Sequence, residues 1–208
     1  MEVGAVITAA GKSSRMGAYK PLLQVGGYSA AKRVIQNIRS AGIGSIVVVT
    51  GNRADELESS LQGLEVTFLR NDLYEYNEMF DSVRIGLRRL KDKCEKVLVT
   101  PVDVPLFSPG TVTALMKSSA DIAIPGFNGQ TGHPVVINGR VIQDIIEYDG
   151  EDGLTGAISR LSFEAEIIEV NDRGILFDMD TPADYAEIIK MYGHLSDGSD
   201  PDYLRSGN

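Results

Sequence analysis

The sequence contains a single cysteine, Cys94, among its 208 residues. One cysteine cannot form an internal disulfide and excludes a zinc site built from several cysteines, and we assign Cys94 no role. Long apolar runs are also missing: the longest run near the start of the chain extends only from Val3 to Ala10, which is too short to cross a membrane. No segment has the pattern of a signal peptide. We therefore expect a cytoplasmic location and no membrane partner.

The sequence also lacks an excess of positive charge. Lysine and arginine total 20 against 29 acidic residues, so the formal net charge is −9. Proteins that hold nucleic acids by their phosphates need a basic surface, and a nucleic-acid partner is therefore not expected. The hydrophobic share of 43% and the charged share of 24% are typical of a globular domain. The length suits one to two domains with a sizeable core.

Short apolar runs alternate with segments of helical periodicity along the chain. Strands are expected at Val3–Ala10, Ser45–Thr50, Glu65–Leu69, Lys96–Thr100, Asp121–Ile124, Pro134–Ile137 and Glu166–Val170, and helices at Ser29–Ala41, Ala54–Leu61, Met79–Lys91, Pro109–Ser119 and Pro182–Tyr192. This order predicts right-handed βαβ crossovers and a mainly parallel sheet inside three α/β/α layers. Residues 1–193 form the expected domain, and the polar residues 194–208 a flexible tail or a truncated linker.

The loop after the first strand has the composition of a triphosphate site. In folds of this kind, ligands lie beyond the carboxyl ends of the strands. The loop contains small residues that allow close backbone approach, two serine hydroxyls and three cationic side chains. These residues are Ala9, Ala10, Gly11, Lys12, Ser13, Ser14, Arg15 and Lys20. Backbone amides beside clustered cations favour a triphosphate, although a surface loop with incidental lysines is the alternative. Val6 rules out a Walker A loop, and G-x-G-x-x-G does not occur.

Carboxylates follow two later segments. Asp103 comes just after an apolar strand, between Pro101 and Pro105, which restrict the local backbone. Such a carboxylate, facing a cationic loop, can hold a phosphate-bound magnesium ion, whereas a turn or capping role is the alternative. Asp178 and Asp180 are two residues apart, so an extended segment would place both on one face as further metal ligands. They could equally stabilise the N-terminus of the helix that follows.

A histidine within Gly132-His133-Pro134 follows a glycine-rich segment, residues 126–132. The glycines suggest a mobile loop over a site. The histidine alone indicates no role, because a single histidine is more often structural than a ligand.

Together these residues resemble the MobA-like nucleotidyltransferase family. The family's opening signature, A-A-G-x-S-x-R-M-G followed by K-x-L-L, is met by Ala9, Ala10, Gly11, Ser13, Arg15, Met16, Gly17, Lys20, Leu22 and Leu23. Its later motifs are met by Pro101, Asp103 and Pro105, by Gly132–Pro134 and by Asp178–Asp184. The family's G-M-S-S-S segment is the exception, because only Met79 and Ser82 match it. Glu78, Phe80 and Asp81 add bulk and negative charge there.

The resemblance implies a Rossmann-like sheet of the nucleotide-diphospho-sugar transferase type. It implies Mg²⁺-dependent transfer of a nucleoside monophosphate from a nucleoside triphosphate to a small phosphorylated acceptor, with release of pyrophosphate. The likeness is greatest to the molybdenum cofactor cytidylyltransferases. The methyl group of Ala10 would narrow the base pocket, which suits CTP or UTP, and the resemblance favours CTP. It also implies delivery of the product to a molybdoenzyme or to a fused domain.

The resemblance also implies roles for individual residues. Arg15, Lys20 and Asp103 would be catalytic, with Asp103, Asp180 and Asp178 as metal ligands and Gly132 and His133 on the acceptor side. The nucleotide would contact Ala9, Ala10, Gly11, Lys12, Ser13, Ser14, Arg15, Lys20, Ser82, Pro101 and Asp103. The alternatives are a sugar-1-phosphate nucleotidyltransferase, a molybdopterin guanylyltransferase, a glycosyltransferase that uses the D-x-D pair, and a non-catalytic module that binds nucleoside triphosphates.

Overall fold

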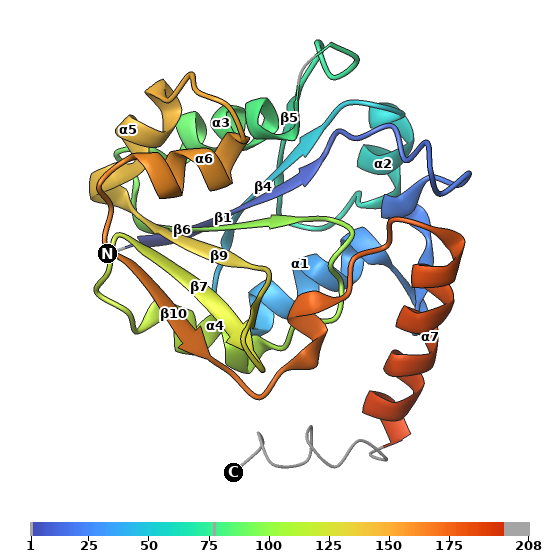
Figure 1. Cartoon of the computed structure of the whole chain (residues 1–208). Helices are drawn as coiled ribbons and strands as arrows, with labels where there is room; N and C mark the ends of the chain where they lie inside the picture. The colour runs from blue at the N-terminus through green and yellow to red at the C-terminus, as the bar shows by residue number, and fades with distance from the viewer. Residues whose placement is uncertain (1, 77, 198–208) are drawn as a thin grey trace.

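A computed structural model describes residues 2–76 and 78–197 of the chain (Figure 1). The strands are β1 (Glu2–Ala9), β2 (Gln24–Val25), β3 (Tyr28–Ser29), β4 (Ser45–Thr50), β5 (Thr67–Arg70), β6 (Cys94–Pro101), β7 (Ile122–Phe127), β8 (Gln130–Thr131), β9 (Val135–Asn138) and β10 (Ala165–Glu169). The α-helices are α1 (Ala30–Ser40), α2 (Ala54–Ser60), α3 (Met79–Leu90), α4 (Pro109–Met116), α5 (Ile142–Glu147), α6 (Gly153–Arg160) and α7 (Pro182–Asp197).

An eight-stranded sheet forms the centre of the fold. Its main path runs β10-β7-β9-β6-β1-β4-β5, and β8 pairs with β7. The pairs β6–β1, β1–β4, β4–β5 and β10–β7 are parallel, while β9 runs antiparallel to both β6 and β7. The expected mainly parallel sheet is confirmed, with β9 and the short β8 as the reversed strands.

Helices cover both faces of this sheet, as Figure 1 shows for α3, α5 and α6 on one side and α1 and α4 on the other. Alternate residues of β1 point to opposite faces. Ile7 packs in the cluster that includes α1, α2 and α4, whereas Val6 packs in the cluster that includes α3, α5 and α6. The three-layer α/β/α architecture is therefore confirmed.

The last helix, α7, packs outside these layers. Its Ile188 and Met191 join Val25, Leu106 and Met179 in a third apolar cluster. The helix continues to Asp197 rather than ending at Tyr192, so the first four residues of the expected tail are helical. Residues 198–208 lie outside the described residues, and the tail assignment there stays a prediction.

In the first 120 residues, the predicted strands and helices agree with the structure within a few residues, and Ser45–Thr50 agrees without error, but the two-residue strands β2 and β3 were missed. Two helices, α5 and α6, were missed. The glycine-rich segment expected to be a mobile loop forms the β7–β8 hairpin, in which Gly126 pairs with Thr131. Asp178 and Asp180 lie in an irregular segment, not on a strand. Within the described residues, no helix is both long and apolar enough to span a membrane.

Candidate active site

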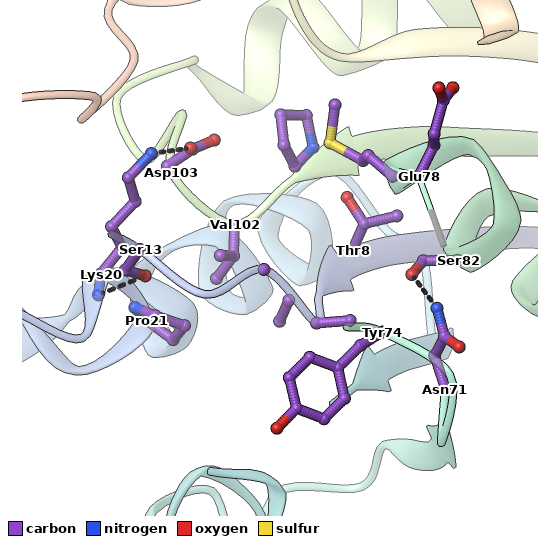
Figure 2. A pocket seen from close by; sticks show the side chains of 15 residues that line it. Thr8, Ser13, Lys20, Pro21, Asn71, Tyr74, Glu78, Ser82, Val102 and Asp103 are labelled. Carbon is purple, nitrogen blue, oxygen red and sulfur yellow. Dashed lines mark hydrogen bonds and ion pairs between the residues drawn. The ribbon is translucent and has the colours of Figure 1, made fainter. Parts of the chain in front are cut away.

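The candidate site lies where β1 and β6 end side by side. These strands are parallel neighbours, with Thr8 opposite Pro101, so the loop after β1 and the segment containing Asp103 meet at one edge of the sheet. A cavity of about 150 Å³ opens there (Figure 2). It is lined by Thr8, Ala9, Ala10, Gly11, Ser13, Lys20, Pro21, Asn71, Tyr74, Glu78, Met79, Ser82, Pro101, Val102 and Asp103. We call it the nucleotide pocket.

The charged centre of the site is the ammonium group of Lys20, which two carboxylates share. Its Nζ lies 2.8 Å from Oδ2 of Asp103 and 2.7 Å from Oδ1 of Asp180. Nη2 of Arg15 reaches the other oxygen of Asp180 at 2.8 Å. The backbone N–H of Met179 donates to the carbonyl oxygen of Asp103 at 3.0 Å, which fixes the two acidic segments against each other. Residues far apart in the sequence therefore converge on one cation.

The surroundings of these groups set their charges. Burial alone would lower the pKa of Lys20, but hydrogen bonds to Asp103 and Asp180 outweigh it and raise that pKa. The hydrogen bond from Lys20 and the charges of Lys20 and Arg15 lower the pKa of Asp180. Both partners are thus charged at neutral pH. Side-chain exposure is 13% for Lys20 and 71% for Arg15, so Lys20 is sheltered, whereas Arg15 is accessible to a ligand even though it is paired with Asp180.

The loop after β1 is held in place by contacts with neighbouring strands. The hydroxyl of Tyr19 donates to the carbonyl oxygen of Asn52 at 2.7 Å, and burial raises the pKa of that phenol to about 12. The backbone N–H of Asn52 donates to the carbonyl oxygen of Ala10 at 3.2 Å. Ser13 accepts the N–H of Lys20 at 3.3 Å, as Figure 2 shows. These hydrogen bonds therefore fix the backbone of the loop after β1.

The opposite wall of the nucleotide pocket is built around Asn71, which follows β5 directly. Its Nδ2 donates to Oγ of Ser82 at 3.1 Å, as Figure 2 shows. Its Oδ1 accepts the N–H of Leu73 at 3.2 Å. These two bonds fix the orientation of a buried amide beside Tyr74. The sequence analysis found Ser82 but missed Asn71 and Tyr74. The strand-end rule could have found Asn71, since it is the first residue after a strand.

Gly51 packs closely against Ala10 and Tyr74, two residues that line the nucleotide pocket. A Cβ atom at Gly51 would lie 2.8 Å from Cβ of Ala10 and 2.8 Å from Cβ of Tyr74. Gly51→Ala should therefore push the loop after β1 out of position and weaken nucleoside triphosphate binding by about tenfold. Gly44→Ala is the matched control, because a Cβ there meets nothing within 4 Å. Calorimetric titration compares the two variants, and equal affinities would contradict this role for Gly51.

A second cavity, of about 460 Å³, adjoins the nucleotide pocket and shares Thr8, Glu78, Met79 and Pro101 with it. We call it the adjacent pocket. Gly132 and His133 both line it, as do residues of α3 and α6. Gly132 has no room for a side chain, since a Cβ would lie 2.2 Å from the carbonyl oxygen of Ile175. Burial lowers the pKa of His133, which is therefore neutral at pH 7.

Most of the expected site residues come together, and three lie apart. Nζ of Lys12 donates to the carbonyl oxygen of Glu75 at 3.4 Å, outside the lining of the nucleotide pocket, and Ser14 is exposed. Asp178 lines a different cavity with Arg173 and Asp184. Burial, together with repulsion from Asp180 and Asp103, raises the pKa of Asp178. It therefore differs from Asp180 in its position and in the direction of its pKa shift.

The carboxylates fit a magnesium ion only with help from a ligand. In the part of the chain described, no group of three or more histidine, cysteine or acidic side chains could hold a metal ion alone. Asp103 and Asp180 nevertheless face one point, which is already a cation site because Lys20 fills it. Mg²⁺ commonly takes one or two protein carboxylates and completes its shell with phosphate oxygens and water. The pair fits a metal that arrives with a triphosphate.

The sequence model described as "MobA-like NTP transferase domain" matches residues 5–165. The chain belongs to this family. A curated relative, the bifunctional protein GlmU of Francisella philomiragia, is 34% identical over 124 residues, which are 58% of this chain and 26% of the relative. This chain therefore spans only about a quarter of the length of that relative.

Three solved structures share the fold of this MobA-like chain. A nucleotidyl transferase from Methanothermobacter superposes with a TM-score of 0.83 at 23% identity, covering 93% of this chain and 98% of the other. Rv0371c of Mycobacterium tuberculosis in complex with manganese gives 0.75 at 19% identity over 91% and 99%. The 2-C-methyl-D-erythritol 4-phosphate cytidylyltransferase of Thermus thermophilus gives 0.71 at 18% identity over 93% and 100%.

Proposed function

We propose that this MobA-like domain transfers a nucleoside monophosphate, CMP in preference to others, from a nucleoside triphosphate to a phosphorylated acceptor and releases pyrophosphate. The acceptor class that we favour is molybdopterin. The observation that carries the proposal is the Lys20 ammonium held between Asp103 and Asp180, beside the backbone of Ala9–Gly11. A positive charge fixed near two carboxylates suits a reaction in which two phosphates must approach each other.

The triphosphate would follow the loop after β1. Lys20 lines the nucleotide pocket and would contact the α-phosphoryl oxygens, where negative charge accumulates. Arg15 and Lys12 are exposed and can turn towards the β- and γ-phosphates. The base would lie against Asn71 and Ser82, whose side chains are already fixed. Each cation therefore has a separate part of the nucleotide to hold.

Asp103 and Asp180 would hold a divalent ion brought by the triphosphate, and Mg²⁺ is the metal that we propose. When bound, such an ion neutralises phosphate charge and orients the reacting oxygens. Lys20 leaves the shared position between the carboxylates and contacts the α-phosphate instead. A phosphate nucleophile is already ionised near pH 7, so no residue of this chain needs to act as a general base.

Base choice is tested by calorimetric titration of CTP, UTP, GTP and ATP, each with and without Mg²⁺. We expect CTP with Mg²⁺ to bind about tenfold more tightly than GTP, because the methyl group of Ala10 narrows the pocket. Cytidylyltransferases among the structural relatives support the same choice. Tighter binding of GTP would contradict the role of Ala10 and would favour a guanylyltransferase.

A sugar-1-phosphate nucleotidyltransferase is the second candidate function. It would use the same nucleotide pocket with a different acceptor. Turnover of sugar phosphates but not of molybdopterin would select it. We also propose a cytoplasmic location, where nucleoside triphosphates are available, and a molybdoenzyme or a fused domain as the recipient of the product.

A further inference from the structure

The adjacent pocket is the place where an acceptor would lie, because it opens into the nucleotide pocket along a shared border. Thr8, Glu78, Met79 and Pro101 line both cavities. An acceptor that attacks the α-phosphorus must keep its nucleophile at this border and its remaining body beyond it. The chemistry of the adjacent pocket therefore reports on the body of the acceptor.

Apolar side chains form most of that wall, and its uncharged polar members are Thr8, Thr131, His133 and Thr155. The lining includes Phe80, Val83, Val99, Ile124, Val135, Leu154 and Ile158. Phe80 is only 8% exposed and is held by an edge-to-face contact with Tyr148 at 6.3 Å between ring centroids. The guanidinium carbon of Arg84 lies 4.7 Å from the same ring centroid. A fixed aromatic ring among aliphatic side chains favours an apolar or planar body over a polyol.

The charge of the adjacent pocket has one sign. No lysine or arginine occurs among its described lining residues, whereas Glu78 and Asp152 are both present. Asp152 has a partner, because Nη2 of Arg160 lies 3.0 Å from its Oδ2. Glu78 lies at the border, and Figure 2 shows its carboxylate directed away from Asn71 and Ser82. The wall therefore offers a carboxylate and no cation to the body of an acceptor.

Asp81, the third acidic residue of this segment, plays a different part. It accepts the N–H of Glu78 at 3.1 Å and lies 3.4 Å from Nη1 of Arg84, so it closes the first turn of α3. It lines neither the nucleotide pocket nor the adjacent pocket. Of the residues that depart from the family's small-residue segment, Glu78 and Phe80 are the ones that change the wall.

We propose that the acceptor has a planar, largely apolar body that presents an ammonium or N–H donor group to Glu78, and that no anionic group of the acceptor lies beside Glu78. This inference rests on the proposed function. A carboxylate-bearing body would meet Glu78 without a neighbouring cation, and a polyol would leave hydroxyls facing Phe80 and Val99. The acceptor specificity of this chain thus differs from that of a transferase for polyol phosphates.

Three probes of nearly equal size test the proposal: the O-phosphates of tyramine, of ethylphenol and of hydroxyphenylpropionic acid. They place an ammonium, nothing or a carboxylate at the same position of one aromatic phosphomonoester. Dissociation constants of the three probes are measured by ligand-observed NMR in the presence of Mg²⁺. Binding of CTP is measured on the same samples. We expect the tyramine probe to bind about tenfold more tightly than the carboxylate probe.

Charge variants identify the group responsible. Glu78→Gln should bring the ratio of the two affinities to within about twofold, and Glu78→Lys should invert it. Asp152→Asn is the matched control and should leave most of the preference, because Arg160 already balances that carboxylate. Thermal melting shows whether each variant is folded.

Equal affinities in the wild type, an unchanged preference in Glu78→Gln, or no binding of any probe overturns the proposal. Nucleotide binding shows whether this inference alone or the proposed function has failed. If CTP binds and the tyramine probe is not preferred, only this inference fails. If no nucleoside triphosphate binds, the proposed function fails.

Discussion

Asp103→Asn is expected to lower the rate of pyrophosphate release by about three orders of magnitude. The substitution keeps the size of the side chain and removes one of the two negative charges that face Lys20, at 2.8 Å from Nζ. An amide is a poor ligand for Mg²⁺ compared with a carboxylate, so the metal–triphosphate complex would lose its protein anchor. Asp180→Asn should have a comparable effect, since Asp180 is the second carboxylate on the same cation.

The matched control is Asp178→Asn, two residues from Asp180 but in a different cavity. We expect it to change turnover by less than about fivefold, as for a residue outside the reacting centre. Folding is monitored by thermal melting, and the backbone bond from Met179 to the carbonyl oxygen of Asp103 should survive the substitution. Full activity in Asp103→Asn, or a greater loss in Asp178→Asn than in Asp180→Asn, would contradict the assignment of the metal ligands.

Lys20→Met is expected to change two properties in opposite directions. Turnover should fall by about two to three orders of magnitude, because the α-phosphoryl oxygens lose their cation. Affinity for Mn²⁺ without nucleotide should instead rise by about tenfold. In the wild type, the ammonium of Lys20 occupies the point that Asp103 and Asp180 share, so a metal ion must displace it. Methionine fills similar space without the charge.

Mn²⁺ binding can be followed by electron paramagnetic resonance, which needs neither turnover nor an acceptor. Lys12→Met is the matched control, because Lys12 bonds to the carbonyl oxygen of Glu75 and contacts neither carboxylate. It should leave Mn²⁺ affinity unchanged and weaken nucleotide binding only. Equal or weaker Mn²⁺ binding in Lys20→Met would show that the ammonium does not compete with a metal.

Local sequence patterns were sufficient for the loop after β1 and for Asp103. Both follow apolar strands, and neighbouring parallel strands end at the same edge of a sheet, so their meeting could be predicted. The contact between Lys20 and Asp180 bridges 160 positions in the sequence. Periodicity cannot place such a pair, and the sequence analysis did not predict this contact. The sequence also could not show that Asp180 contacts Lys20 while Asp178 lines a different cavity, because both lie in an irregular backbone segment.

The acceptor side shows the limit of prediction most clearly. Helices α5 and α6 are short, and they flank a segment rich in glycine and aspartate that has no periodicity to read. Yet α6 supplies Gly153, Leu154 and Ile158 to the adjacent pocket. The negative charge of Glu78 was visible in the sequence. Its position on the border between two cavities was not, since that depends on how α3 and α6 pack together.

The most direct test of the account uses the products of the reaction. The protein is incubated with Mg²⁺, CTP and a panel of phosphomonoesters that includes the tyramine phosphate probe, and the mixture is analysed by mass spectrometry. The account predicts equal amounts of pyrophosphate and of an acceptor bearing a CMP group, with neither formed by Asp103→Asn. Release of inorganic phosphate and CDP instead would show attack at the γ-phosphate, and it would contradict the assignment of this site as a nucleotidyltransferase centre.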